Sequence, residues 1–431
     1  MKKYPSNPLL PNDIYVPDVE AHVWADGRIY LYGTYEKKDK NLDSVFHVYS
    51  SDDMVNWIDH GVAFSSKQVQ WITTQHLWAP DCAYRNGKYY LYYSIPTGEC
   101  GVAISDKPYG PFDDIGQVLG VQGIDPAVLI DDDGQAYLYW GQVDNVCVAK
   151  LKENMTEIEI DSIQHPLNVK DHEYHEGSSI RKINGKYYYL YTDTHRHGKK
   201  PTAQGYSVSD NPMKGFVYKN IVIDNFGCDP VTWNNHGSME CFKGQWYIFY
   251  HRSTHATDHY RQLCAEPITI DENGNIKEAP MTSSGAGKSI PAKEIIPACY
   301  TCSLTGNARI ASDENSLYAL AVREILPNDT LLYRYIAFNG ETTIQLRIKA
   351  NGIGTIQKTR IHAATWSQND PPRVELYLDD IYYDSIAFSK ATNEYTKIEQ
   401  AIPSVVGTHT LTLKFFGNFE NADLDEIHFY K

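Results

Sequence analysis

The hydrophobic and polar positions of the first ~250 residues follow one pattern that returns five times. Each copy is a polar turn pair with glycine followed by a run of aromatic and branched residues, as in Asp26-Gly-Arg-Ile-Tyr-Leu-Tyr32. The turn glycines stand 60, 47, 51 and 59 residues apart, at Gly27, Gly87, Gly134, Gly185 and Gly244. Such a pair before such a run is typical of a hairpin entering a strand. Because four-stranded units repeating at about 40–50 residues are propeller blades, the pattern predicts a five-bladed β-propeller.

The pattern changes near Pro280. Residues 281–289 form a small, polar, glycine-bearing segment that is typical of a linker. From about Pro297 onward, short alternating runs such as 331–338 and 409–416 indicate strands with close turns and no helical period. We therefore expect an all-β chain, with a five-bladed propeller at residues 1–290 and a β-sandwich (jelly-roll-like) domain at residues 291–431.

Composition narrows the range of partners. The 431 residues carry a formal charge of −15 without a basic cluster, so we expect no nucleic-acid partner. The 33 tyrosines and eight tryptophans suit both strand cores and stacking on sugar rings. No stretch approaches the ~18 apolar residues of a membrane helix, so we expect no membrane partner. The first residues lack an apolar signal region, which favours a cytoplasmic location, or secretion if a leader has been removed. The sequence leaves the oligomeric state open.

Acidic residues recur just before the repeated strands. They stand at comparable places in the five copies, as Asp18, Asp81, Asp125, Glu176 and Glu240. In a propeller these positions precede or begin the innermost strands and can point at the axial mouth. Carboxylates that crowd there raise some pKa values and depress others, which lets a general acid and a general base coexist at neutral pH. Any single aspartate is more often a loop cap, but the shared register favours a functional site.

Five short motifs in fixed order carry a family resemblance. They are Asp18, Trp78-Ala-Pro-Asp81, Ile124-Asp-Pro126, His175-Glu-Gly177 and His236-Gly-Ser238. Over roughly residues 5–290 the chain resembles glycoside hydrolase family 43. The resemblance implies a five-bladed propeller that hydrolyses arabinose- and xylose-containing glycans with inversion.

The resemblance also implies roles for three carboxyl groups. Asp18 would be the base that activates water, Glu176 the acid that protonates the leaving oxygen, and Asp125 the residue that orients Glu176 and raises its pKa. Inversion needs two carboxyl groups about 6.5–9.5 Å apart, with water between them. Val19 follows Asp18 where the family usually has proline, so Glu20 is kept as a rival base.

Four more residues are candidates by the same resemblance. His236 matches an axial histidine that faces a calcium or sodium ion, although a lone histidine is more often a hydrogen-bonded core residue and calcium prefers oxygen ligands. Arg261 would reach the substrate near the base, or else form a surface ion pair. Trp78 is a candidate sugar platform and Trp24 a second one, and either could equally be core. We expect no organic cofactor.

The C-terminal domain resembles a family 6 carbohydrate-binding module. The likeness is carried by residues 407–416 and 424–429. Sugar binding by this domain and a purely buttressing role are both open.

Together these features predict an inverting exo-glycosidase that releases terminal β-xylosyl or α-L-arabinofuranosyl residues from hemicellulose-derived oligosaccharides or polysaccharides. An endo-arabinanase or a galactofuranosidase of the same family remains an alternative, as does a non-catalytic carbohydrate-binding propeller. The joint presence of Asp18, Asp125 and Glu176 favours an enzyme over a binding module.

Overall fold

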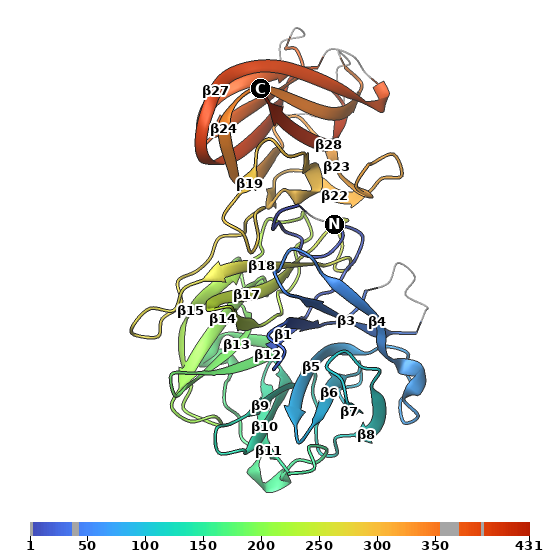
Figure 1. Cartoon of the computed structure of the whole chain (residues 1–431), viewed down its shortest axis with the longest axis vertical. Coiled ribbons are helices and arrows are strands. Elements are labelled where there is room, and N and C mark those ends of the chain that lie inside the picture. Colours follow the sequence, from blue (N-terminus) through green and yellow to red (C-terminus); the bar gives the residue numbers. More distant parts are fainter. Residues whose placement is uncertain (1–2, 37–42, 354–369, 389–391) are drawn as a thin grey trace.

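The computed structural model describes residues 3–36, 43–353, 370–388 and 392–431. It confirms the predicted all-β class, with a five-bladed propeller followed by a C-terminal β-sheet domain (Figure 1). The described helices are single turns: η1 (Ser66–Gln68), η2 (Ile160–Ser162), α1 (Val169–His172) and η3 (Ala298–Tyr300). No described helix has the length and apolar character that crossing a membrane requires.

The five blades are antiparallel sheets that follow one another along the chain. Blade one is β1 (Glu20–Val23), β2 (Ile29–Tyr32), β3 (Val45–Ser51) and β4 (Ile58–Ser65). Blade two is β5 (Trp78–Arg85), β6 (Lys88–Ser94), β7 (Cys100–Ser105) and β8 (Asp113–Gln117). Blade three is β9 (Ala127–Ile130), β10 (Ala136–Gln142) and β11 (Asn145–Leu151). Blade four is β12 (Tyr174–Ile183), β13 (Lys186–Asp193), β14 (Ala203–Ser209) and β15 (Val217–Asp224). Blade five is β16 (Met239–Phe242), β17 (Gln245–Arg252) and β18 (Gln262–Ile268).

The five sequence copies form the second strand of each blade, β2, β6, β10, β13 and β17. Their turn glycines have φ between +76° and +84°, a conformation that glycine adopts without strain. Successive side chains of a strand point to opposite faces, so each copy packs into two inter-blade cores. Leu138 packs toward blade two, for example, and Tyr139 toward blade four. The repeated aromatic run therefore specifies both the strands and the stacking of the blades.

The ring closes where blade five meets the N-terminal segment. Leu9 N–H donates to the Leu263 carbonyl at 2.9 Å, and Ala265 N–H donates to Asn7 Oδ1 at 3.0 Å. Asn7 Nδ2 donates in turn to the carbonyls of Ala265 (3.2 Å) and Thr282 (3.0 Å). The first residues of the chain thus fasten the last blade to the first.

The C-terminal domain is one hydrogen-bonded sheet of ten strands around a single apolar core. Its long strands β24 (Thr330–Asn351) and β27 (Thr392–Phe416) pair with each other and curve around that core (Figure 1). The other strands are β19 (Ile290–Pro291), β20 (Ile296–Pro297), β21 (Ser303–Leu304), β22 (Arg309–Ser312), β23 (Leu320–Ile325), β25 (Arg373–Leu378), β26 (Ile381–Ala387) and β28 (Asn421–Tyr430). The proposed division at residues 290 and 291 falls within β19 and stays a prediction.

The two domains are joined by backbone hydrogen bonds as well as by the chain. Leu304 N–H donates to the Gly227 carbonyl at 2.8 Å, and His255 N–H donates to the Ile310 carbonyl at 2.6 Å. Because such bonds fix backbone positions on both sides, the C-terminal sheet supports blades four and five.

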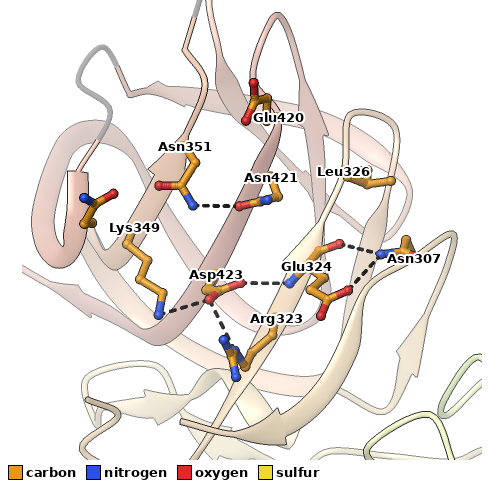
Figure 2. Close-up of a pocket in the computed structure, with 10 residues that line it drawn as sticks. Asn307, Arg323, Glu324, Leu326, Lys349, Asn351, Glu420, Asn421 and Asp423 are labelled. Atoms are coloured by element: carbon orange, nitrogen blue, oxygen red, sulfur yellow. Dashed lines mark hydrogen bonds and ion pairs between the residues drawn. The ribbon is translucent and has the colours of Figure 1, made fainter. Parts of the chain in front are cut away.

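A hollow of about 640 Å³ lies on the C-terminal sheet (Figure 2). Asp423 occupies its centre and pairs with Lys349 at 3.1 Å and Arg323 at 3.3 Å. Asn351 Nδ2 donates to Asn421 Oδ1 at 2.9 Å along one side. The hollow is polar, and its charges are largely paired with one another.

Candidate active site

A cavity of about 720 Å³ opens at the axial mouth of the propeller, and side chains of all five blades line it. Six of the predicted site residues line this cavity: Asp18, Trp78, Asp125, Glu176, His236 and Arg261. They are brought together because each lies at or near the start of an innermost strand, or in a loop at the same end of the blades. The propeller thus assembles one site from positions almost 250 residues apart.

Asp18 and Asp125 occupy equivalent places, two residues before β1 and β9. Both have φ of +58°, in the left-handed region that non-glycine residues seldom adopt. Backbone strain of this kind is typical of functional positions, where the surrounding structure enforces it. Together with Glu176 these residues present three carboxyl groups that are each less than 9% exposed.

Asp18 is paired with Arg261 through both carboxylate oxygens. Arg261 Nη1 donates to Oδ1 at 3.0 Å and Nη2 donates to Oδ2 at 3.3 Å. Glu36 holds the guanidinium from the other side, accepting from Arg261 Nε at 2.9 Å. Burial raises the pKa of Asp18, but Arg261, assisted by His236 and His251, lowers it further, so that the net pKa lies below its ordinary value. Asp18 is therefore ionised at neutral pH, as a general base must be.

Glu176 lies at the start of β12 with both oxygens hydrogen-bonded. Asn234 Nδ2 donates to Oε1 at 2.8 Å and Gln142 Nε2 donates to Oε2 at 2.8 Å. Asn234 also accepts from Arg261 Nη1 at 3.1 Å through its Oδ1. One amide thus connects the group that holds Asp18 with the carboxyl group of Glu176.

Asp125 supports Glu176 through the backbone. Gly177 directly follows Glu176, and its N–H donates to Asp125 Oδ2 at 2.9 Å. The same Oδ2 lies 3.8 Å from His236 Nδ1. Burial raises the pKa of Asp125 to about 7, with Glu176 and Asp18 adding to the rise against the opposite effect of His236. Gly177 is required here, since its φ is +75° and a Cβ would lie 2.9 Å from the His236 ring.

His236 is a buried residue that lines the cavity. Its Nδ1 is 3.8 Å from an oxygen of Asp18 as well as of Asp125. Burial lowers the pKa of this imidazole, but the neighbouring carboxylates, led by Asp125 and Asp18, raise it to a net value above the ordinary one. Its Nε2 is buried and has no hydrogen-bond partner among the described residues.

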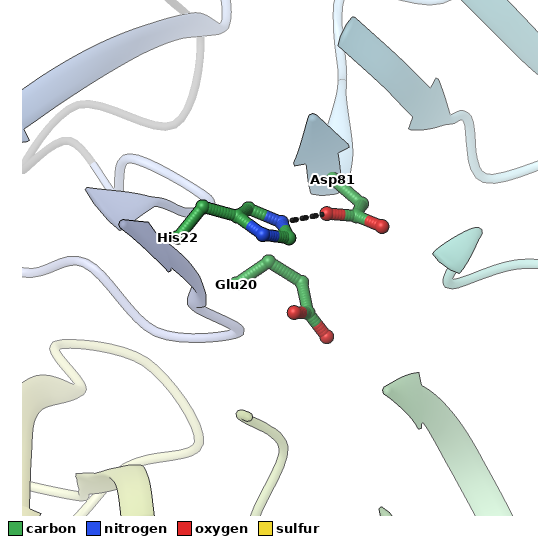
Figure 3. A group of neighbouring side chains, drawn as sticks. All are labelled: Glu20, His22 and Asp81. Atoms are coloured by element: carbon green, nitrogen blue, oxygen red, sulfur yellow. Dashed lines mark hydrogen bonds and ion pairs between the residues drawn. The ribbon is translucent and has the colours of Figure 1, made fainter. Parts of the chain in front are cut away.

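The innermost strands carry a second polar cluster, formed by Glu20, His22 and Asp81 (Figure 3). His22 Nε2 lies 2.7 Å from Asp81 Oδ1, and one donor atom from each of the three residues falls within 4.8 Å of the others. Glu20 Oε2 pairs with Arg181 at 2.9 Å, whereas its buried Oε1 has no partner in the described part of the chain. Glu20 is not among the residues that line the cavity, so the geometry favours Asp18 over Glu20 as the base.

The cavity walls include two partly exposed tryptophans. Trp78 is 36% exposed and Trp233 is 46% exposed. Trp24 does not line this cavity: it follows β1, whereas Asp18 precedes β1 and lies at the mouth. Instead, Trp24 stacks on His22 with ring centroids 5.0 Å apart and donates to the Tyr32 hydroxyl at 3.0 Å.

Sequence reasoning missed four residues of the site: Glu36, Gln142, Trp233 and Asn234. Asn234 stands two residues before His236, so its place beside a recognised motif was an available signal. Glu36 and Gln142 lie four and two residues beyond the repeated aromatic runs, in positions that carry no motif.

Known proteins resemble this chain in sequence and in fold. Residues 5–276 match the family described as Glycosyl hydrolases family 43. A xylosidase/arabinosidase of Thermoclostridium stercorarium is 31% identical over 70% of this chain and 73% of its own. A second similar protein is CoXyl43, a β-xylosidase/α-arabinofuranosidase from a compost metagenome, solved in a calcium-free form with xylotriose. Its structure has a TM-score of 0.56 to this chain at 28% identity, and the match covers 65% of this chain and 98% of that one.

A third relative covers the whole fold. An arabinoxylan arabinofuranohydrolase of Bacillus subtilis, solved with cellotetraose, aligns with 99% of this chain and 98% of its own at a TM-score of 0.55. At 23% identity this likeness concerns the fold alone, and it extends through the C-terminal sheet.

Proposed function

The chain belongs to glycosyl hydrolase family 43, and from this premise we propose that it is an inverting exo-glycosidase. It releases terminal β-xylosyl or α-L-arabinofuranosyl residues from hemicellulose-derived glycans. The observation that carries the proposal is a single cavity holding Asp18, kept ionised by Arg261, together with the hydrogen-bonded carboxyl group of Glu176. The names of its relatives, which include xylosidases and arabinosidases, support the choice of pentosyl substrates.

The reaction assigns one proton transfer to each of two carboxyl groups. A water molecule attacks the anomeric carbon and gives a proton to Asp18, while Glu176 gives its proton to the glycosidic oxygen as the carbon–oxygen bond breaks. Asp125 does not exchange a proton with substrate. It holds the backbone after Glu176 through the Gly177 N–H, which fixes the direction of the acid.

The aromatic walls suit a sugar substrate. Sugar rings present apolar faces that pack on aromatic side chains, and the partly exposed Trp78, at the start of β5, lines the same cavity as the carboxyl groups. Arg261 lies at the base and orients Asp18, so it is a buried partner of the base rather than part of a surface ion pair.

Buried side chains of the propeller also offer ligand atoms for a cation. His236 Nε2 and Glu20 Oε1 are buried without partners among the described residues, and a carboxylate oxygen is a ligand that calcium prefers. We therefore propose that calcium or sodium binds on the axis near His236, where its charge would stabilise the crowded carboxylates; no organic cofactor takes part. If metal analysis shows that a chelator has removed calcium, but neither the activity nor the thermal midpoint changes, this proposal is contradicted.

The C-terminal domain is proposed to be a module similar to carbohydrate-binding modules of family 6. Affinity electrophoresis of the full chain on xylan and arabinan tests this, with Asn421→Ala as the variant in the hollow of Figure 2. Retardation that the substitution abolishes supports sugar binding there. Migration that neither polymer changes would favour the buttressing role, which the hydrogen bonds between the domains already support.

The decisive test is hydrolysis of nitrophenyl β-xylopyranoside, α-L-arabinofuranoside and β-galactofuranoside by wild type, Asp18→Ala and Glu176→Gln. We expect turnover of one or both pentosides, and its loss by at least 100-fold in Asp18→Ala. For Glu176→Gln we expect a loss of that size on the disaccharide of the same sugar, because its leaving hydroxyl, unlike a nitrophenolate, needs the proton of the acid. Preference for the galactofuranoside would identify the alternative sugar class. Activity on polymer alone would identify an endo-acting enzyme, and no hydrolysis of any glycan would identify a binding propeller.

A further inference from the structure

The two amides that hold Glu176 are not equivalent. Asn234 cannot reverse its amide, because its Oδ1 already accepts from two donors, Arg261 Nη1 at 3.1 Å and His251 Nε2 at 2.9 Å. A guanidinium group has donors only, so the reversed amide would place N–H groups against N–H groups. Asn234 therefore always presents an N–H to Oε1 of Glu176.

His251 fits this assignment. Its ring is fully buried, and burial followed by the charge of Arg261 lowers its pKa to about 3, so the ring is neutral at working pH. A neutral ring has one N–H, and Asn234 Oδ1 can only accept, so His251 carries its proton on Nε2. The orientation of Asn234 is thus fixed by two donors that do not change.

The side-chain amide of Gln142 can reverse its orientation, whereas that of Asn234 cannot. It is the last residue of β10, its side chain is exposed, and its bond to Glu176 Oε2 is the one side-chain hydrogen bond that it makes within the described ranges. A half-turn of its amide exchanges the N–H donor for the carbonyl acceptor at the same place. Gln142 can therefore serve either form of the carboxyl group.

We propose that Gln142 is a positioning residue of the acid: it reverses its amide as Glu176 gains and loses a proton, so that the proton is carried on Oε2 while Asn234 keeps Oε1 unprotonated. The inference rests on the proposed role of Glu176 as the acid. In the productive step, the O–H bond at Oε2 breaks and the proton moves to the glycosidic oxygen. The carboxylate that remains accepts one N–H on each oxygen, which is the arrangement in the structure.

The cycle is then completed by solvent. Asp18 holds the proton taken from the attacking water and releases it to solvent, and Glu176 takes up one proton on Oε2. Gln142 turns its carbonyl oxygen toward that new O–H and holds the proton on Oε2, until the glycosidic oxygen of the next substrate replaces the amide as its acceptor. Without this acceptor, the O–H of Glu176 can rotate away from the substrate.

The test compares two leaving groups in Gln142→Met. A nitrophenolate leaves with little help from an acid, whereas the hydroxyl of a second sugar needs a full proton. For the disaccharide of the sugar that wild type releases, we expect kcat to fall about tenfold, the effect of one hydrogen bond to a charged or reacting group. For the nitrophenyl glycoside we expect less than a twofold change. Gln135→Met is the matched control, because Gln135 precedes the same strand and its side chain donates to the Ala136 and Leu151 carbonyls, away from Glu176.

A second variant gives a readout that a structural role would not move. In Gln142→Glu the added carboxylate faces Glu176, so we expect the alkaline limb of the kcat/KM profile to move about one pH unit upward. Equal losses on both substrates in Gln142→Met, or an unmoved alkaline limb in Gln142→Glu, would refute the inference. Glu176→Gln separates the two failures, since retained disaccharide hydrolysis in that variant would refute the proposed acid itself.

Discussion

Removing the guanidinium of Arg261 tests how the site keeps its base ionised. In Arg261→Met, Asp18 and Glu36 lose their shared partner and stay buried, with side chains only 10% and 9% exposed. Breaking a buried pair by removing one member costs about 3–5 kcal/mol. At about 2 °C per kcal/mol for a unit of this size, the thermal midpoint of the propeller should fall by roughly 6–10 °C at neutral pH.

The pH dependence of this loss has a definite sign. In wild type the pKa values of Asp18 and Glu36 lie below their ordinary values, so the pairing stabilises the fold above those values and fades as the pH falls through the folded pKa values. In the variant the guanidinium no longer opposes the effect of burial, so both pKa values rise. The deficit should therefore be largest at neutral pH and shrink toward about pH 5 and below, where the carboxyl groups take up protons. For the same reason the acid limb of kcat/KM should move to higher pH.

Calorimetry or circular dichroism at several pH values measures the effect. Arg28→Met is the matched control, because Arg28 pairs at 2.9 Å with Asp52, whose side chain is 67% exposed, and such a pair contributes at most about 1 kcal/mol. If the two variants lost the same stability, or if the deficit of Arg261→Met grew as the pH fell, the account of Asp18 as a base held ionised by Arg261 would be wrong.

Three further predictions concern other parts of the molecule. Gly177→Ala should lower the stability by about 1–3 kcal/mol and should also lower kcat. The φ of Gly177 is +75°, and the new Cβ would lie 2.9 Å from the His236 ring, so both the backbone and the ring oppose the methyl group. Thermal melts and steady-state kinetics measure the two effects. Asn7→Ala should lower the thermal midpoint by several degrees without changing KM, because a buried side chain with bonds to Ala265 and Thr282 fastens the last blade to the first. Trp78→Ala should raise KM roughly five- to tenfold, whereas Trp24→Ala should leave KM unchanged, because Trp78 lines the cavity and Trp24 does not; equal KM values for the two variants would contradict this placement.

Much of the fold could be predicted because its signal is repeated. The turn glycines need positive φ and the aromatic runs pack between blades, so each copy carries local and long-range information at once. The ring closure through Asn7 carries no such repetition, and it depends on one amide meeting the last blade from the other end of the chain.

The site was predictable where residues lie in motifs and not where single loops place them. Asp18, Asp125 and Glu176 converge because they share a register at the inner strands. Gln142 and Glu36 reach the cavity from other positions, and nothing in their neighbours marks them. Trp24 is a predicted site residue that lies outside the cavity. Strand β1 has only four residues, but its two ends face different parts of the propeller, and the sequence does not say which end faces the substrate.

The most direct test of the account is the configuration of the sugar at the moment of its release. Proton NMR of the wild-type reaction, on the terminal pentoside that it turns over fastest, resolves the two anomers before they equilibrate. The account predicts that the anomer opposite to that of the substrate appears first, because Asp18 activates water on the face opposite the oxygen that Glu176 protonates. Initial release of the anomer with the substrate's own configuration would contradict it, and would require one of these carboxylates to attack the sugar directly.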